Sequence, residues 1–153
     1  MAFYRKSGGG NVTPTIVKRR SGGAWVTPAT IKRRSGGSWV TVWTAEVPLT
    51  ASLSQSTING TNSDTTVQGT VTSDNVACNT SGGTGAAKTY TWRNTGGSTA
   101  ITAVNPNSAS TAFTRTGVQG IVTSTFVCDV SDGTYSATTG TLTVNLEYIR
   151  EGV

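Results

Sequence analysis

The residues that could carry acid–base, nucleophilic or metal chemistry are few in this chain. Its 153 residues include no histidine, two cysteines and seven acidic side chains. Without histidine, neither a Ser-His-Asp nor a Cys-His arrangement can form, and histidine-based metal sites are absent. Cys78 and Cys128 are 50 positions apart, and two such cysteines do not make a zinc site. We therefore expect no cofactor, no metal and no enzymatic activity.

The acidic residues are poor candidates for paired acid–base work. A glycosidase needs two carboxylates on either side of a bond in a cleft. Asp129 and Asp132 instead flank a predicted turn, where aspartate commonly bonds the backbone. We interpret the acidic residues as turn-forming side chains; they are Glu46, Asp64, Asp74, Asp129, Asp132, Glu147 and Glu151.

A 14-residue repeat in the first third of the chain points to binding rather than catalysis. Ser7, Ser21 and Ser35 each begin a Ser-Gly-Gly that follows paired basic residues. Trp-Val-Thr follows the second and third copies, whereas the first copy has Asn11 in the tryptophan position. Because Gly-Gly between two β-prone runs is typical of a hairpin turn, we expect hairpins here. We expect them to join into an up-and-down meander that reverses at the two Thr-Pro pairs.

Charge is divided unevenly along the chain. Residues 1–45 contain eight basic residues and no acidic one, whereas residues 46–153 contain four basic and seven acidic residues. This asymmetry indicates an anionic partner, such as nucleic acid, an acidic protein face or a lipopolysaccharide surface. The same change in composition predicts two domains, a basic anchoring and oligomerisation region at 1–45 and a β-sandwich at 46–153.

The basic and aromatic residues of the repeat are the candidate docking residues. Tryptophan and arginine are enriched at interface hot spots, and so small a meander has no independent core for three tryptophans. Alternatively, the tryptophans form the repeat's own apolar layer. Binding of single-stranded nucleic acid by these residues is a third possibility, although we do not expect nucleic acid to be the main partner. The candidate residues are Arg19, Arg20, Trp25, Arg33, Arg34, Trp39 and Trp43.

The remainder of the chain has the pattern of an all-β sandwich. Short β-prone segments alternate with turn residues about every 8–12 positions. We expect strands at 49–53, 66–72, 76–79, 89–93, 101–103, 110–114, 121–130 and 141–147. We expect turns at 59–60, 72–75, 81–85, 96–97, 105–107 and 132–133.

The order Cys78, Trp92, Cys128 matches the immunoglobulin pattern. In that fold, strands B and F carry the cysteines and strand C packs its tryptophan against them. Phe126 stands where many such domains have a tyrosine, so the tyrosine corner is missing. The two sulfurs either form a bridge, worth roughly 3–4 kcal/mol, or remain thiols that face each other in the core. Two unrelated buried thiols are the remaining alternative.

Several segments together resemble the Ig-like domains appended to tail and other virion proteins of tailed bacteriophages. They are Ser81–Gly85, Thr89–Trp92, Ile101, Asn107–Phe113 and Phe126–Gly133. The Lys-Arg-Arg-Ser-Gly-Gly-x-Trp-Val repeat is similar to short β repeats of phage structural proteins. The resemblance implies a virion component that assembles in the host bacterial cytoplasm and is later exposed outside.

These observations lead to an interpretation as a non-enzymatic phage structural protein. The repeats would dock to tail or capsid proteins, with the tail tip or fibre favoured over capsid decoration or a head fibre. The Ig-like domain would be displayed for weak adhesion to the host surface or its glycans. We expect a homo-oligomer, with a trimer as the first guess, no signal peptide and no membrane insertion. The alternatives are a cell-surface carbohydrate-binding module and a basic nucleic-acid-binding accessory protein.

Overall fold

The computed structural model describes residues 5–7, 10–12, 19–21, 23–26, 28–45 and 47–152, which form strands and no helix. The predicted all-β class is therefore confirmed. The chain divides into two compact units, Met1–Val47 and Pro48–Val153. This division falls at Pro48, two residues beyond the predicted boundary.

Each repeat of the first unit forms its own antiparallel hairpin. β1 (Arg5–Ser7) pairs with β2 (Gly10–Val12), β3 (Arg19–Ser21) with β4 (Ala24–Val26), and β5 (Thr30–Ser35) with β6 (Ser38–Thr44). Within the described residues these are three separate two-stranded sheets. The predicted continuous meander is thus wrong. A short local loop such as Gly36-Gly37 closes at little entropic cost, whereas a proline between copies lacks the N–H that a ladder needs. The Thr13-Pro14 turn and Thr27 lie outside the described residues.

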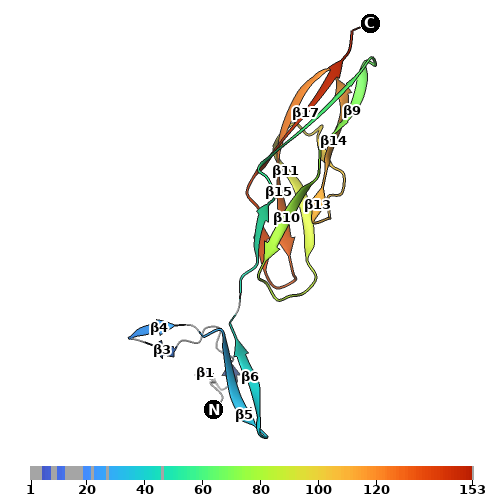
Figure 1. Cartoon of the computed structure of the whole chain (residues 1–153). Helices are drawn as coiled ribbons and strands as arrows, with labels where there is room; N and C mark the ends of the chain where they lie inside the picture. Colours follow the sequence, from blue (N-terminus) through green and yellow to red (C-terminus); the bar gives the residue numbers. More distant parts are fainter. Residues whose placement is uncertain are drawn as a thin grey trace. The chain divides into compact units, whose positions relative to one another are not determined.

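The second unit is a two-layer sandwich (Figure 1). One layer contains, in order, β11 (Thr89–Gly97), β15 (Gly120–Ser131), β17 (Leu142–Arg150) and β8 (Thr57–Asp64), and β16 (Ser136–Thr138) also pairs with β15. Every second residue of β17 from Leu142 to Tyr148 is buried. This alternation is the pattern of a sheet with one face on a core.

The other layer consists of two short sheets that continue each other. β7 (Thr50–Leu53), β10 (Val76–Ser81) and β13 (Ser110–Thr111) form one, and β9 (Gln68–Thr72), β14 (Phe113–Val118) and β12 (Thr102–Ala103) form the other. Cys78 therefore lies in one layer, on β10, and Trp92 and Cys128 in the other, on β11 and β15. This is the strand arrangement of an immunoglobulin sandwich, with B paired to E and C paired to F.

The predicted turn at 72–75 is a break in one strand line and not a reversal of the chain. The Ser73 amide donates to the Phe113 carbonyl (2.9 Å), and the Phe113 amide donates to Ser73 Oγ (3.0 Å). β9 and β10 therefore pair with successive parts of the same partner, β14 and β13. The Ser73 hydroxyl accepts a ladder bond here, which the turn-like residue types did not indicate.

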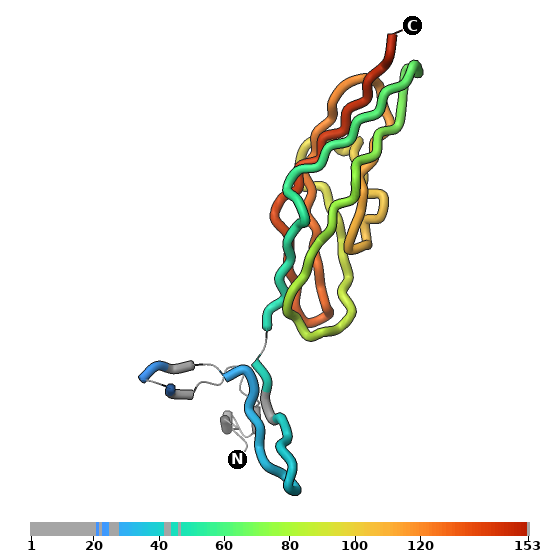
Figure 2. The backbone as a smooth tube through the Cα atoms, viewed as in Figure 1, coloured from blue at the N-terminus to red at the C-terminus, as the bar shows by residue number. Residues whose placement is uncertain are grey.

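The predicted turn at Asn59-Gly60 lies inside β8, and this prediction is wrong. β8 runs parallel to β17, a pairing that joins segments far apart in the sequence (Figure 2). Asn59 Oδ1 accepts a bond from Asn145 Nδ2 (3.0 Å), and a Cβ on Gly60 would lie 2.9 Å from both Leu146 Cδ2 and the Thr72 carbonyl. A glycine inside a strand often marks such a close approach.

The predicted Ig core residues all lie in one buried cluster. Trp92 and Cys128 are direct cross-strand partners, and Cys78 and Phe126 are buried in the same cluster. The Trp92 and Phe113 rings pack edge-on with their centroids 5.8 Å apart, and the centroids of the Phe113 and Phe126 rings are 4.5 Å apart. The Trp92 indole N–H donates to the Ser108 carbonyl (2.9 Å), so its polar atom is satisfied. Phe113 links the two layers.

Tyr148 ties the last strand to the turn between β8 and β9. Its ring is fully buried, and its hydroxyl donates to the Thr66 carbonyl at 2.8 Å and lies 2.9 Å from Thr66 Oγ1. The ring covers Gly69, where an added Cβ would lie 2.1 Å from a ring carbon. Although Phe126 lacks a hydroxyl for a tyrosine corner, Tyr148 makes a comparable bond to the backbone from β17.

Neither cysteine should react with a thiol reagent such as DTNB while the protein is folded. Both thiols are buried and unbridged, and burial together with the Cys78 thiol raises the pKa of Cys128 to about 12. Burial also raises the pKa of Cys78. Because the thiolate is the reactive form, we expect no reaction at mildly alkaline pH in buffer and two reactive thiols per chain in denaturant. Rapid reaction of the native protein would contradict this placement, and no thiol in denaturant would reveal a Cys78–Cys128 bridge.

Candidate docking site on the hairpin repeat

The three hairpins have the same register, so the repeat places equivalent residues opposite each other. Arg34 pairs with Trp39 in the third hairpin and Arg20 with Trp25 in the second. In the first hairpin, Lys6 pairs with Asn11. Each hairpin therefore sets a basic residue opposite the tryptophan position of its own copy.

The third hairpin is built on a tight two-residue turn. Gly36 and Gly37 both have positive φ, 56° and 86°, as a type I′ turn requires, and Ser35 pairs with Ser38 directly beside it. Since the pair that closes such a turn exchanges hydrogen bonds, the next pair, Arg34 and Trp39, does not. In such a pair the side chains lie closer together, with Cα atoms about 4.5 Å apart.

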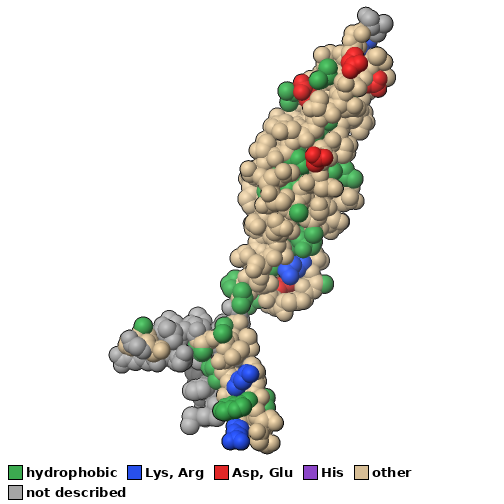
Figure 3. Space-filling view, in the orientation of Figure 1, with side chains coloured by type: hydrophobic (Ala, Val, Ile, Leu, Met, Phe, Trp, Pro, Cys, Tyr) green, Lys and Arg blue, Asp and Glu red, His purple; other side chains and the backbone are tan. Residues whose placement is uncertain are grey.

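The side chains of this hairpin are largely open to solvent. Trp39 is 69% exposed and Val40 is 45% exposed. Lys32, Arg33 and Arg34 are also exposed, and none of the three forms an ion pair within the described part of the chain. Figure 3 shows basic side chains on either side of a hydrophobic one on this hairpin, with no acidic side chain among them. The hairpin thus presents charge and apolar surface that no described residue covers.

The structure accounts for the predicted docking residues to different degrees. Arg33, Arg34 and Trp39 are exposed on β5 and β6. Arg19 and Arg20 lie on β3, Trp25 on β4 and Trp43 on β6, opposite Ile31, but the side chains of these four lie outside the described residues. Lys32 and Thr41 pair with each other and share the face of Arg34 and Trp39. The period-2 alternation of a strand already places Thr41 on the side of Trp39, but the predicted docking residues include neither Lys32 nor Thr41.

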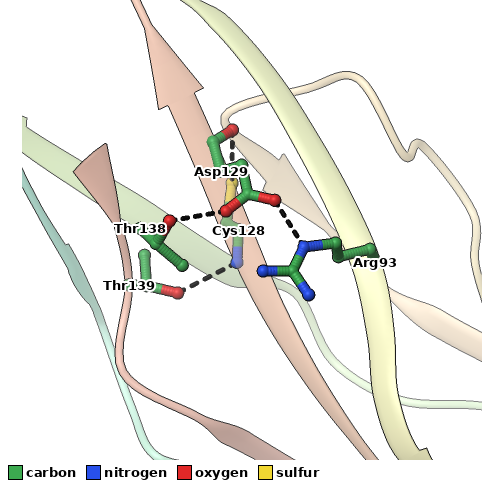
Figure 4. A network of polar contacts seen from close by, with 5 residues as sticks. All are labelled: Arg93, Cys128, Asp129, Thr138 and Thr139. Atoms are coloured by element: carbon green, nitrogen blue, oxygen red, sulfur yellow. Dashed lines mark hydrogen bonds and ion pairs between the residues drawn. The ribbon is translucent and has the colours of Figure 1, made fainter. Parts of the chain in front are cut away.

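The Asp129 carboxylate bonds side chains of the neighbouring strands of its sheet. Its Oδ2 accepts from Arg93 Nε (2.5 Å) and its Oδ1 from Thr138 Oγ1 (2.6 Å), while Thr139 Oγ1 accepts from the Cys128 amide (Figure 4). The bond from Arg93 lowers the pKa of Asp129. Both charged side chains are substantially exposed, so their attraction contributes little stability.

Asp132 ties together two loops at one end of the sandwich. Its Oδ2 accepts from the Thr84 amide (2.7 Å) and hydroxyl (3.1 Å), and its Oδ1 accepts from the amides of Thr134 (3.0 Å) and Tyr135 (2.7 Å). Gly83 has a φ of +78°, and an added Cβ would lie 2.4 Å from Asp132 Oδ2. The two turn signals at 81–85 and 132–133 thus belong to one hydrogen-bonded unit, a connection that their sequence positions do not indicate.

Replacing Asp132 by alanine should lower the melting temperature by several degrees at neutral pH, because three backbone amides lose their acceptor. Bonds from the Tyr135 and Thr84 amides lower the pKa of Asp132 well below its usual range. A carboxylate with a lowered folded pKa stabilises the protein above its unfolded pKa of about 3.9 and loses that effect as pH falls further. The difference between wild type and variant should therefore shrink in strong acid. Asp74→Ala is the control, because the Asp74 carboxylate is exposed and makes no hydrogen bond to any described residue. Equal thermal shifts for the two variants would show that the Asp132 carboxylate does not hold the two loops together.

Within the described residues, no three His, Cys, Asp or Glu side chains are grouped in a way that could hold a metal ion. The same part of the chain contains no helix long and apolar enough to cross a membrane. Neither a scan of protein-family models nor a search of curated proteins finds a match to this chain.

Proposed function

We propose that the chain is a non-enzymatic structural protein of a tailed bacteriophage particle. The hairpin repeat docks it to tail or capsid proteins, with the tail tip or fibre favoured, and the Ig-like sandwich is displayed. The observation that carries this proposal is the contrast between the two units. The sandwich buries a complete core of its own, whereas the third hairpin leaves Trp39 and three cations uncovered.

Physical arguments support docking through the hairpins. An isolated two-stranded hairpin is at best marginally stable in water, so these sheets gain stability when a partner covers them. Exposed tryptophan and arginine are the side chains whose burial contributes most to interfaces, often 2 kcal/mol or more each. Three hairpins share one register, and two of them pair an arginine with a tryptophan, so contacts made by several hairpins strengthen one another when they bind together.

The sandwich offers polar rather than aromatic groups for adhesion to a cell surface. Its exposed large hydrophobic residues in the described range are aliphatic, such as Val67, Val118 and Ile121. The outer face of β8, β17 and β15 instead carries a ladder in which Thr123 bonds Asn145 (2.8 Å) and Asn145 bonds Asn59 (3.0 Å). Contact with host glycans would then rest on hydroxyl and amide groups, with weak single sites that many copies strengthen.

Light scattering on the full-length chain and on a chain that begins at Pro48 tests the assembly role. We expect a trimer for the full-length protein and a monomer for the shorter one, because the isolated two-stranded sheets lie in the first unit. A trimer of the shorter chain would place assembly in the sandwich. If both chains are monomeric, the hairpins do not drive self-assembly, and their role is limited to docking on a partner.

A further inference from the structure

We propose that one face of the hairpin repeat binds single-stranded nucleic acid. This face consists, in the third hairpin, of Lys32, Arg34, Trp39 and Thr41, and we call it the Arg34 face. The inference goes beyond particle docking and does not depend on it, because it concerns what the isolated chain binds in solution.

Register and exposure define the Arg34 face. Cross-strand partners lie on the same side of an antiparallel pair, and positions two apart on a strand do so as well. Arg34 opposite Trp39 and Lys32 opposite Thr41 therefore form one four-residue surface, in which all four side chains are exposed. Arg33 and Val40, the pair between them, lie on the other side.

Charge complementarity selects an anionic partner. Residues 1–45 carry eight basic residues and no acidic one, and the cations of the third hairpin form no ion pair with any residue that the structure describes. Lys32 and Arg34 are two strand positions apart, about 7 Å, which resembles the spacing of successive phosphates in an extended single strand. A polymer with regularly spaced anionic groups therefore matches Lys32 and Arg34 better than a ligand with a single anionic group does.

The exposed indole selects a nucleic acid among linear polyanions. Trp39 is 69% exposed, and a flat aromatic ring beside cations is the arrangement on which unpaired bases stack. Bases within a duplex are already stacked on each other, so the ring favours a single strand. An acidic polypeptide or a sulfated glycan meets the charge of the face but offers no aromatic base for the indole.

The repeat gives the other two hairpins the same strand register. The second hairpin places Arg20 opposite Trp25 in the register of Arg34 and Trp39, and the first places Lys6 opposite Asn11. Each hairpin thus repeats a basic residue opposite the tryptophan position. A polymer that binds one hairpin can reach the next, so that the contacts act together.

The test is a fluorescence titration of the full-length chain with oligo(dT), with heparin and polyglutamate as separate polyanions. We expect oligo(dT) to quench tryptophan emission, and its affinity to fall with salt with a log–log slope of about −3 for roughly four phosphate contacts, one each at Lys6, Arg20, Lys32 and Arg34. Binding without quenching, equal affinity for heparin or polyglutamate, or no binding of oligo(dT) would each overturn the proposal.

A matched pair of variants locates the face. Arg34→Ala and Arg33→Ala remove the same charge from adjacent positions on opposite sides of β5. We expect Arg34→Ala to weaken oligo(dT) binding about tenfold and Arg33→Ala much less. We expect Trp39→Ala to weaken binding about tenfold and to reduce the quenching. Equal effects of the two arginine variants would show a diffuse charge effect and would overturn the assignment of the face. If the wild-type chain does not bind oligo(dT), this inference fails but the proposal of particle docking does not, because docking is tested separately on virions.

Discussion

Replacing Gly69 by alanine lowers the free energy of unfolding of the sandwich by about 3 kcal/mol. The new methyl group would lie 2.1 Å from the Tyr148 ring, well inside van der Waals contact. Tyr148 is fully buried and cannot move away without breaking its bonds to Thr66. The variant must therefore displace the ring, distort β9 against β14, or both. Urea or guanidinium unfolding of the purified protein measures the change.

Gly140→Ala is the control for this prediction. No atom lies within 4 Å of the position of its added Cβ, and its backbone is not in the left-handed region. We expect a change within about 0.5 kcal/mol, as for an ordinary surface substitution. If the Gly69 and Gly140 variants unfold at the same denaturant concentration, Tyr148 is not packed on Gly69 as described.

We predict that removing residues 1–47 leaves the sandwich as stable as before but abolishes the incorporation into particles that the proposed function requires. All residues of the buried core cluster belong to the segment from Leu49 to Tyr148, so its melting temperature should not change. The deletion removes eight of the twelve basic residues and three of the four tryptophans. If two or more interface hot spots are lost at about 2 kcal/mol each, affinity for the particle falls by several hundredfold or more.

The measurement compares tagged full-length and shortened chains that are produced in the host during phage assembly. We expect the full-length chain in purified virions and the shortened chain only in the unbound fraction. Equal incorporation of the two chains would place the docking contacts in the sandwich. A large loss of thermal stability on deletion would contradict the independence of the two units.

The sequence was most informative where chemistry and local pattern agree. The hairpin turn at Gly36-Gly37 followed from residue type, because only glycine adopts two successive positive φ values without strain. The placement of Cys78 in one layer and of Trp92 and Cys128 in the other followed from their order in the chain, since the immunoglobulin pattern is defined by those three residues.

The sequence was misleading where distant contacts determine the local structure. Asn59 and Gly60 are typical turn residues, but parallel pairing with β17 and the close approach of Leu146 place them inside a strand. The bonds of Asp132 to Thr84 and of Tyr148 to Thr66 join residues 48 and 82 positions apart. No local pattern marks such pairs. At the docking site, the tryptophans and arginines were evident, whereas the finding that Arg34, and not Arg33, lies opposite Trp39 required the register.

Limited trypsin digestion of purified virions, followed by mass spectrometry, tests the central claim most directly. Trypsin cleaves after lysine and arginine, and Lys32, Arg33 and Arg34 are exposed on the isolated hairpin. We predict that the chain is present in virions, that cleavage after these three residues is rapid in the isolated protein, and that it is absent until the particles are disrupted. Absence of the chain from virions, or equally rapid cleavage in intact particles, would contradict the proposal that the hairpins dock this protein to a phage particle.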